Sequence, residues 1–385
     1  QGTSVDIPAD SLLQETGADP ANDLGFELRV NLGERRGDWQ WQADYQLLAR
    51  KGDRFEAQQQ NPELDFGAAA FVDDDTRLFD LTRRISDGDD RVVAHRLDRL
   101  YLGYSDVKTV LKFGRQAISW GNGLIYNPVD FFNPFDPAAI DTEYKTGDDM
   151  LYGQCLLDSG DDLQALWVLR RDADGDVERE VASLAVKFHG FAAAGEYDLL
   201  LAEHYDARNV ALGGASSAGD AIWRGDLMLT DSGDETFSSA VLNWSYSWVA
   251  WNRNLSAAIE YYRNGFGIDD GDYGPPALAD NPELVERIRR GELFTLGRDY
   301  LAATATLELT PLWLLTASLF NNLNDNSRLL QVFSRHDLAQ NSQLLLALNL
   351  PSGSDGSEFG GIDSGVEGRP LASGNSLFAQ LAWYF

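Results

Sequence analysis

The sequence predicts an all-β protein: a single antiparallel up-and-down β-barrel that crosses a membrane. Three observations predict this fold class. Apolar and polar residues alternate along most of the 385-residue chain, as they do in strands with lipid on one side and water on the other. No stretch approaches the roughly 18 consecutive apolar residues of a membrane-spanning helix. Very short turns and long polar loops join the alternating segments, and transmembrane barrels have both. We expect about 16 strands, with 14 to 18 allowed by the even-number rule.

The last predicted strand is the clearest, and it sets the direction of all the others. Apolar residues occupy every second position from Leu377 to Phe385, so the chain ends on an aromatic residue. This end resembles the C-terminal strand of Gram-negative outer-membrane β-barrels, in which the terminal Phe is recognised by the barrel-assembly machinery. The resemblance implies an outer-membrane protein, surrounded by lipid and lipopolysaccharide, whose chain ends in the periplasm. For this segment taken alone, the alternative is a buried edge strand of a soluble sandwich.

The other elements follow in chain order. Residues 1–24 lack the alternation, so we expect a periplasmic tail or a lumen insert there, and a barrel over residues 25–385. The chain begins without Met or an apolar leader, which predicts a mature protein whose signal peptide has been removed. Alternation leaves two segments open: 77–85 is a separate strand or an extension, and 206–214 is a short strand or a loop. Residues 281–293 have helical spacing and predict a short surface helix.

The connections predict which end of the barrel faces outward. Short turns such as 105–106 and 310–311 contrast with three long polar segments at 119–148, 266–297 and 351–374. Counted back from a final strand that ends in the periplasm, all three long segments fall on the extracellular side. Short periplasmic turns and long extracellular loops are typical of outer-membrane barrels.

The segment 119–148 carries the densest motif. Gly-Arg-Gln at 114–116 leads to Trp-Gly at 120–121 and to Asn-Pro-Val-Asp at 127–130. This pattern resembles a group of proteobacterial porin-like and exporter-like outer-membrane proteins that includes relatives of the alginate-export barrel. Its prolines exclude a regular strand, and its three Phe residues predict packing against the inner barrel wall. We therefore expect a loop that folds inward and constricts the lumen, with a structured extracellular cap as the alternative.

An inward loop would place polar side chains at the narrowest point of the lumen. Arg115 would face them, or would form a structural ion pair that never meets a solute. Acidic members of the set are also candidates to hold Ca²⁺, although the spacing lacks the form of an EF-hand. The candidate pore-lining residues of this region are Arg115, Trp120, Asn127, Asp130, Asn133, Asp136, Asp141, Glu143 and Lys145.

A second candidate set lies on the two strands before this loop. His95 and Arg99 share one face of the segment 92–104, and Lys108 and Lys112 lie on the polar side of the next segment. Together they predict a basic stripe opposite an acidic loop, which would orient polar solutes by a transverse field. The alternative is cross-strand charge pairing that only stabilises the wall.

Composition and motifs exclude several function classes. A net charge of -30 argues against nucleic acid as a partner. The four His residues are dispersed, and no nucleophile elbow, P-loop or dinucleotide fingerprint is present. His204, near the outer rim, is the best candidate for a hydrolase, but we expect no enzyme and no cofactor.

We expect a channel that passes small solutes or an exported product, with a periplasmic or inner-membrane transport partner in the second case. The alternative from another class is a barrel without an open pore that serves assembly, adhesion, or lipid or partner binding. The sequence does not identify the solute.

Overall fold

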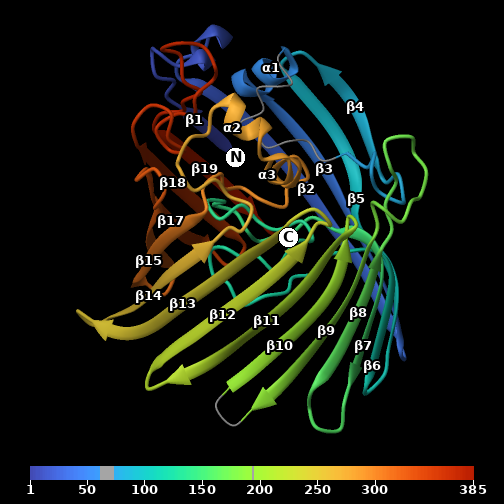
Figure 1. Cartoon of the computed structure of the whole chain (residues 1–385). Coiled ribbons are helices and arrows are strands. Elements are labelled where there is room, and N and C mark those ends of the chain that lie inside the picture. Colours follow the sequence, from blue (N-terminus) through green and yellow to red (C-terminus); the bar gives the residue numbers. More distant parts are fainter. Residues whose placement is uncertain (61–72, 193–194) are drawn as a thin grey trace.

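The computed structural model describes residues 1–60, 73–192 and 195–385, which form one antiparallel sheet with few helices (Figure 1). Eighteen strands of this described part close into a ring, and a nineteenth, β4, lies outside it. The strands are β1 (Gly2–Val5), β2 (Ala21–Arg36), β3 (Trp39–Gly52), β4 (Thr82–Gly88), β5 (Arg91–Ser105), β6 (Thr109–Gln116), β7 (Asp148–Leu156), β8 (Asp162–Val168), β9 (Ser183–Ala192), β10 (Gly195–His204), β11 (Ala207–Ala218), β12 (Ala221–Asp231), β13 (Thr236–Ala250), β14 (Arg253–Arg263), β15 (Asp299–Thr310), β16 (Trp313–Asn322), β17 (Arg328–Ala339), β18 (Ser342–Ser352) and β19 (Ser376–Trp383).

The barrel closes through its shortest strand. β1 pairs with β19 and with β2, so that Gly2 lies opposite both Ala379 and Leu24. The segment 1–24, expected as a tail or lumen insert, thus supplies β1 and the start of β2, with a 3-10 helix (Leu12–Thr16) between them. Four residues are too few to show a two-residue period, which is why the sequence did not reveal β1.

The ring of 18 strands is larger than the expected 16, though within the allowed range. The segment 206–214, left open between strand and loop, belongs to the full strand β11 from residue 207 onward. The segment 77–85 leads into the separate strand β4. This strand pairs with residues 91–96 of β5, and β6 pairs with residues 100–105 on the same edge. Small residues such as Gly213 and Gly214 weaken the apolar alternation of β11 and hide it from pattern analysis.

Large apolar side chains cover the outer face of the wall. Leu212, Leu242 and Leu377 are each about 55% exposed and belong to different parts of the ring. A closed barrel with such a band buries it in the hydrocarbon of a bilayer, because contact between these apolar side chains and water is unfavourable. Trp244, Tyr246 and Trp248 stack along the outer face of β13, where aromatic rings suit a membrane interface. No helix within the described residues is long and apolar enough to cross a membrane.

The long connections leave from one end of the barrel. They join β6 to β7, β14 to β15, and β18 to β19, and the second holds α2 (Pro275–Ala279) and α3 (Pro282–Arg289). α3 confirms the helix expected within 281–293. The connection after β3, which holds α1 (Asp53–Gln60), and the one between β8 and β9 lie at the same end. The part of the first that falls in 61–72 is outside the described residues.

Candidate functional site in the lumen

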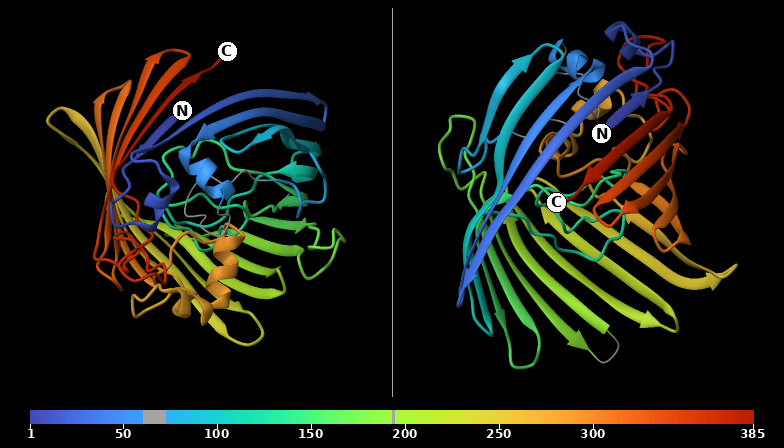
Figure 2. Two further views of the ribbon diagram at one scale, coloured as in Figure 1. Left: turned by 90° about the horizontal axis from the view of Figure 1, so that it is seen from above. Right: turned by 180° about the vertical axis from the view of Figure 1, so that it is seen from behind.

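The β6–β7 loop, residues 117–147, lies inside the ring when the barrel is seen from above (Figure 2). Its apolar residues pack against inward-facing side chains of the wall and fill the lumen beside β7 to β12. Burial of aromatic side chains is the main favourable term in such packing. The buried loop residues are Trp120, Val129, Phe131 and Phe132, and their wall partners include Met150, Leu166, Leu200 and Met228.

One carboxylate on the wall fixes the outgoing part of the loop. Glu260 of β14 accepts the backbone N–H groups of Leu124, Ile125 and Tyr126 at 2.7, 3.0 and 2.6 Å. Its side chain is fully buried, so these donors replace the water that an ionised carboxylate requires. The ring of Tyr126 then stacks on the ring of Tyr262, which lies two residues after Glu260 on β14, with centroids 4.7 Å apart.

A second carboxylate holds the turn before this point. Asp226 of β12 accepts the backbone N–H of Asn122 at 2.6 Å and its side-chain amide at 2.7 Å. The Asn122 carbonyl in turn accepts the amide of Asn243 on β13 at 3.0 Å. The outgoing part of the loop is therefore bonded to three consecutive strands, β12 to β14.

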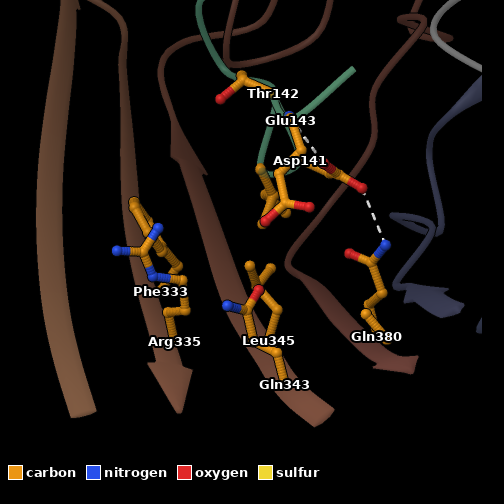
Figure 3. Close-up of a pocket in the computed structure, with 10 residues that line it drawn as sticks. Asp141, Thr142, Glu143, Phe333, Arg335, Gln343, Leu345 and Gln380 are labelled. Carbon is orange, nitrogen blue, oxygen red and sulfur yellow. Dashed lines mark hydrogen bonds between the residues drawn. The ribbon is translucent and has the colours of Figure 1, made fainter. Parts of the chain in front are cut away.

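The returning part of the loop crosses to the opposite side of the ring. The amide of Gln331 on β17 donates to the carbonyl of Ala138 at 2.8 Å. Gln380 on β19 donates to Asp141 at 2.9 Å (Figure 3), and Tyr384, directly after β19, donates to Glu143 at 3.0 Å. The loop thus spans the lumen from β12–β14 to β17–β19.

The returning part then reaches β2 and β3. The hydroxyl of Tyr144 donates to Asp44 of β3 at 2.8 Å, and the guanidinium of Arg29 on β2 lies 3.3 Å from the centroid of the Tyr144 ring. A guanidinium over an aromatic face is attracted by the ring quadrupole. Tyr144 therefore ties the end of the loop to the two strands that follow β1 in the ring.

Lys145 joins the two ends of the loop and forms an ion pair with Asp130 between them. The ammonium of Lys145 lies 2.6 Å from Asp130 and also donates to the Ile118 carbonyl and the Ser119 hydroxyl. Burial raises the pKa of Asp130 to about 6, although Lys145 opposes the shift. Burial also lowers the pKa of Lys145. Both groups are buried away from water, so the pair forms at an electrostatic cost.

The motif residues inside the loop mainly shape the loop itself. Trp120 donates its indole N–H to Gln164 of β8 at 2.9 Å. Asn127 donates to the carbonyl of Trp120 at 2.8 Å, and Asp136 accepts the N–H of Ala138 at 2.8 Å. Asn133 has a φ of 52°, in the left-handed region that Asn tolerates. Asp141 and Glu143 are the predicted residues that face an open pocket, described below.

Arg115 does not line the pore, and the prediction that it does is wrong. It shares a face of β6 with Leu111 and Phe113, which are exposed on the outside of the barrel. There it is fully buried, forms a bidentate pair with Asp149 at 2.9 and 3.0 Å, and donates to Asp74 at 2.8 Å. The structural ion pair, left open as the alternative, is the arrangement found.

The predicted basic stripe does not form, because a β-bulge changes the facing of β5. The pairing of β3 with β5 shifts between Asp44 and Tyr45, which leaves Asp98 as the extra residue. His95 consequently lies beside Tyr45 on the outer face, and its prediction as a lumen residue is wrong. A bulge reverses which alternate residues point inward.

The other three members of that set are dispersed. Arg99 faces inward, where it pairs with Asp98 and donates to the Lys145 carbonyl. Lys112 also faces inward, with its ammonium 5.1 Å from the centroid of the Tyr101 ring. Lys108 lies in the β5–β6 turn and pairs with the exposed Asp158, so it is not part of the lumen.

The loop carboxylates do not gather around a cation. Asp130 is held by Lys145, Asp141 by Gln380 and Glu143 by Tyr384. Within the described ranges, no group of three or more His, Cys, Asp or Glu side chains is placed to hold a metal.

His204 lies in a Ser–His–Glu line, but this line is not accessible to a substrate. Its ring nitrogens lie 2.7 Å from the Ser183 hydroxyl and 3.0 Å from Glu292. Ser183 is 1% exposed and accepts a hydrogen bond from Arg170 at 2.7 Å. The ring of Phe131 covers His204 at 4.7 Å. The line therefore links the β14–β15 loop to the wall and does not form a hydrolase site.

Sequence reasoning missed the wall residues that hold the loop, above all Glu260 and Asp226. Both stand at inward positions of strands that otherwise alternate cleanly. A buried carboxylate in such a position needs hydrogen-bond partners. This requirement was the signal in the sequence that could have indicated both residues as anchors of the loop.

The fold and the site together define a transmembrane β-barrel with a folded loop across its lumen. No protein-family model matches the sequence, and no curated protein matches it. Among solved structures, the chain is similar to OccAB1 of Acinetobacter baumannii, with a TM-score of 0.52 and 10% identity over 100% of this chain and 95% of that one. OccAB2 of the same organism has a TM-score of 0.50 and 11% identity, over 99% and 94% of the two chains. At this identity the likeness shows the barrel fold alone.

Proposed function

We propose that the protein is a channel of the Gram-negative outer membrane that passes small solutes through a lumen narrowed by residues 117–147. The observation that carries the proposal is the anchoring of this loop on opposite sides of the ring, at Glu260 and at Gln380. A loop held in this way reduces the free cross-section of the lumen. The closed ring of strands with its apolar outer band supports the outer membrane as its location.

Passage through such a channel needs no chemical step. Solutes move down their gradients, so the proposal covers uptake and export alike. In the described part of the chain, the carboxylates of Asp141 and Glu143 have no basic side chain within ion-pair distance. Carboxylates of this kind in a lumen favour cations over anions.

Deletion of residues 126–142 tests the constriction. The single-channel conductance of the purified protein in a planar bilayer should rise several-fold, because the part that crosses the lumen is removed. Deletion of residues 173–175, in the exposed β8–β9 connection, is the control and should leave the conductance unchanged. An equal conductance of the wild type and the 126–142 deletion would contradict the constriction. A folded barrel that inserts but never conducts would contradict the channel and favour a partner-binding role.

A further inference from the structure

A pocket lies between the returning part of the loop and the inner face of β17 to β19 (Figure 3). Its floor follows the register of the sheet. Arg335 of β17 lies opposite Leu345 of β18, and Leu345 lies opposite Gln380 of β19. Figure 3 shows Arg335 and Gln380 on opposite sides of the pocket with Leu345 between them. The pocket thus has a cationic end, a middle formed by Leu345 and Gln343, and a polar end.

The loop adds negative charge at the end away from Arg335. Asp141 accepts the amide of Gln380, and Glu143 lies beside it. Neither carboxylate has a cationic partner among the described residues, and Arg335 has no carboxylate within ion-pair distance there. Lys187, another inward-facing charge of the lumen, is by contrast paired with Asp198 at 3.0 Å. The two ends of this pocket therefore carry opposite charges that have no ion-pair partner among the described residues.

The spacing of the wall residues at the two ends indicates the size of an occupant. Arg335 and Gln380 are separated by two strand spacings, roughly 9–10 Å between Cα atoms. The amine and carboxylate of an α-amino acid share one carbon and are too close together to engage both ends. An occupant needs its two ionic groups at the ends of a short body, and Phe333 and Leu345 offer that body an apolar surface.

We propose that this pocket binds small zwitterions whose amine and carboxylate are separated by an apolar body, with ω-amino acids as the simplest case. Asp141 and Glu143 bind the ammonium, Arg335 binds the carboxylate through its planar fork, and Leu345 supports the methylene chain. The inference rests on the proposed channel and names the solute class that its constriction selects.

The test uses 6-aminohexanoate as the probe, with hexanoate and hexylamine as analogues that each carry one charge. Added to the bilayer chamber, 6-aminohexanoate should reduce the ion current of the wild type at a concentration at least about fivefold lower than either analogue requires. Arg335→Gln, and separately the pair Asp141→Asn with Glu143→Gln, should each weaken this block about tenfold. Such a loss corresponds to about 1.4 kcal/mol.

Arg224→Gln is the matched control. Arg224 faces the lumen from β12, donates to Ser245 at 3.0 Å and lies outside the pocket, so this variant should be blocked like the wild type. The heat-dependent gel mobility of each variant shows that its barrel is folded. Equal block by hexanoate and 6-aminohexanoate would overturn the inference, because Arg335 would then act as a simple anion site.

Two further outcomes separate this inference from the channel proposal. A conducting channel that 6-aminohexanoate does not block would overturn the inference and leave the channel standing. A barrel that does not conduct would overturn the channel. Calorimetric titration of the detergent-solubilised barrel then decides on the pocket: 6-aminohexanoate must bind to the wild type and not to Arg335→Gln.

Discussion

The carboxylate of Glu260, in the wall of the barrel, accepts the backbone N–H of Tyr126, in the lumen loop, at 2.6 Å. The same carboxylate serves the two preceding N–H groups of the loop. A loop without regular structure has backbone groups that need partners once they leave water. Here one wall residue supplies them, so the position of the loop depends on the strand as much as on the loop sequence.

Glu260→Gln should loosen the loop. The amide keeps one acceptor oxygen but turns an N–H₂ group toward backbone donors, so at least one charge-assisted hydrogen bond worth roughly 1.5–3 kcal/mol is lost. We expect a noisier open-channel current with a higher mean conductance than that of the wild type, measured in planar bilayers. Glu308→Gln, near the opposite end of the barrel on β15, is the control. A Glu260→Gln channel with wild-type current would show that this anchor is dispensable.

Arg115→Leu should destabilise the barrel and leave its ion selectivity unchanged. The substitution strips the buried Asp149 and Asp74 of their shared cation, and removal of one partner of a buried pair costs roughly 3–5 kcal/mol. The temperature at which the folded band disappears in heat-modifiability gels should fall. The reversal potential in a salt gradient should not move, because the guanidinium lies outside the lumen.

Lys108→Gln is the control for this prediction. Lys108 is exposed and its partner Asp158 is 91% exposed, so the variant should keep wild-type stability. A shifted reversal potential in Arg115→Leu, with stability unchanged, would contradict the placement of Arg115.

Arg115 and His95 show where a two-residue period stops being informative. The period identified most of the strands, and counting these strands predicted that the three long loops leave from one end of the barrel. It could not reveal the bulge at Asp98, which reverses the facing of His95, because a bulge leaves no period of its own. It also could not reveal that residues 73–81 fold back over Arg115, because that contact joins segments far apart in the sequence.

The lumen loop shows the same limit of sequence analysis. Its aromatic residues predicted a packed segment, and Phe131 and Phe132 are indeed buried against the wall. The choice of anchors depends on which strands lie opposite one another across the ring. That relation follows from strand number and closure, and β1, only four residues long, was not visible as a strand.

Neutralising the free carboxylates of the pocket should weaken the preference for cations. Asp141→Asn combined with Glu143→Gln removes two negative charges from the lumen without changing the size of the side chains. The cation-to-anion permeability ratio should fall roughly twofold or more, and by more at low salt than at high salt, because salt screens these charges. Reversal potentials in KCl gradients measure the ratio. Asp172→Asn with Asp174→Asn, in the β8–β9 connection, should leave it unchanged. An unaltered ratio in the pocket variant would exclude these carboxylates from the ion path.

Glu358 should make the closure of the long connections depend on pH. Its carboxylate accepts the N–H of Leu296 at 2.7 Å, the hydroxyl of Tyr300 at 2.7 Å and the amide of Asn322 at 2.8 Å, and so joins the β18–β19 connection to the β14–β15 connection. Burial raises its pKa from 4.5 to about 7. A pKa raised in the closed state means that closure binds a proton. The closed arrangement therefore gains stability as the pH falls from about 7 toward 4.5, and loses it as the pH rises through 7.

Limited proteolysis of the two connections measures this effect. In the wild type, cleavage between residues 353 and 374 should slow by roughly tenfold from pH 8 to pH 6, since local opening controls access. Glu358→Gln cannot titrate, so its cleavage rate should be the same at both pH values after correction for protease activity. Glu367→Gln, an exposed residue of the same connection, should keep the wild-type dependence. A Glu358→Gln variant that still follows the wild-type pH profile would assign the dependence to another group.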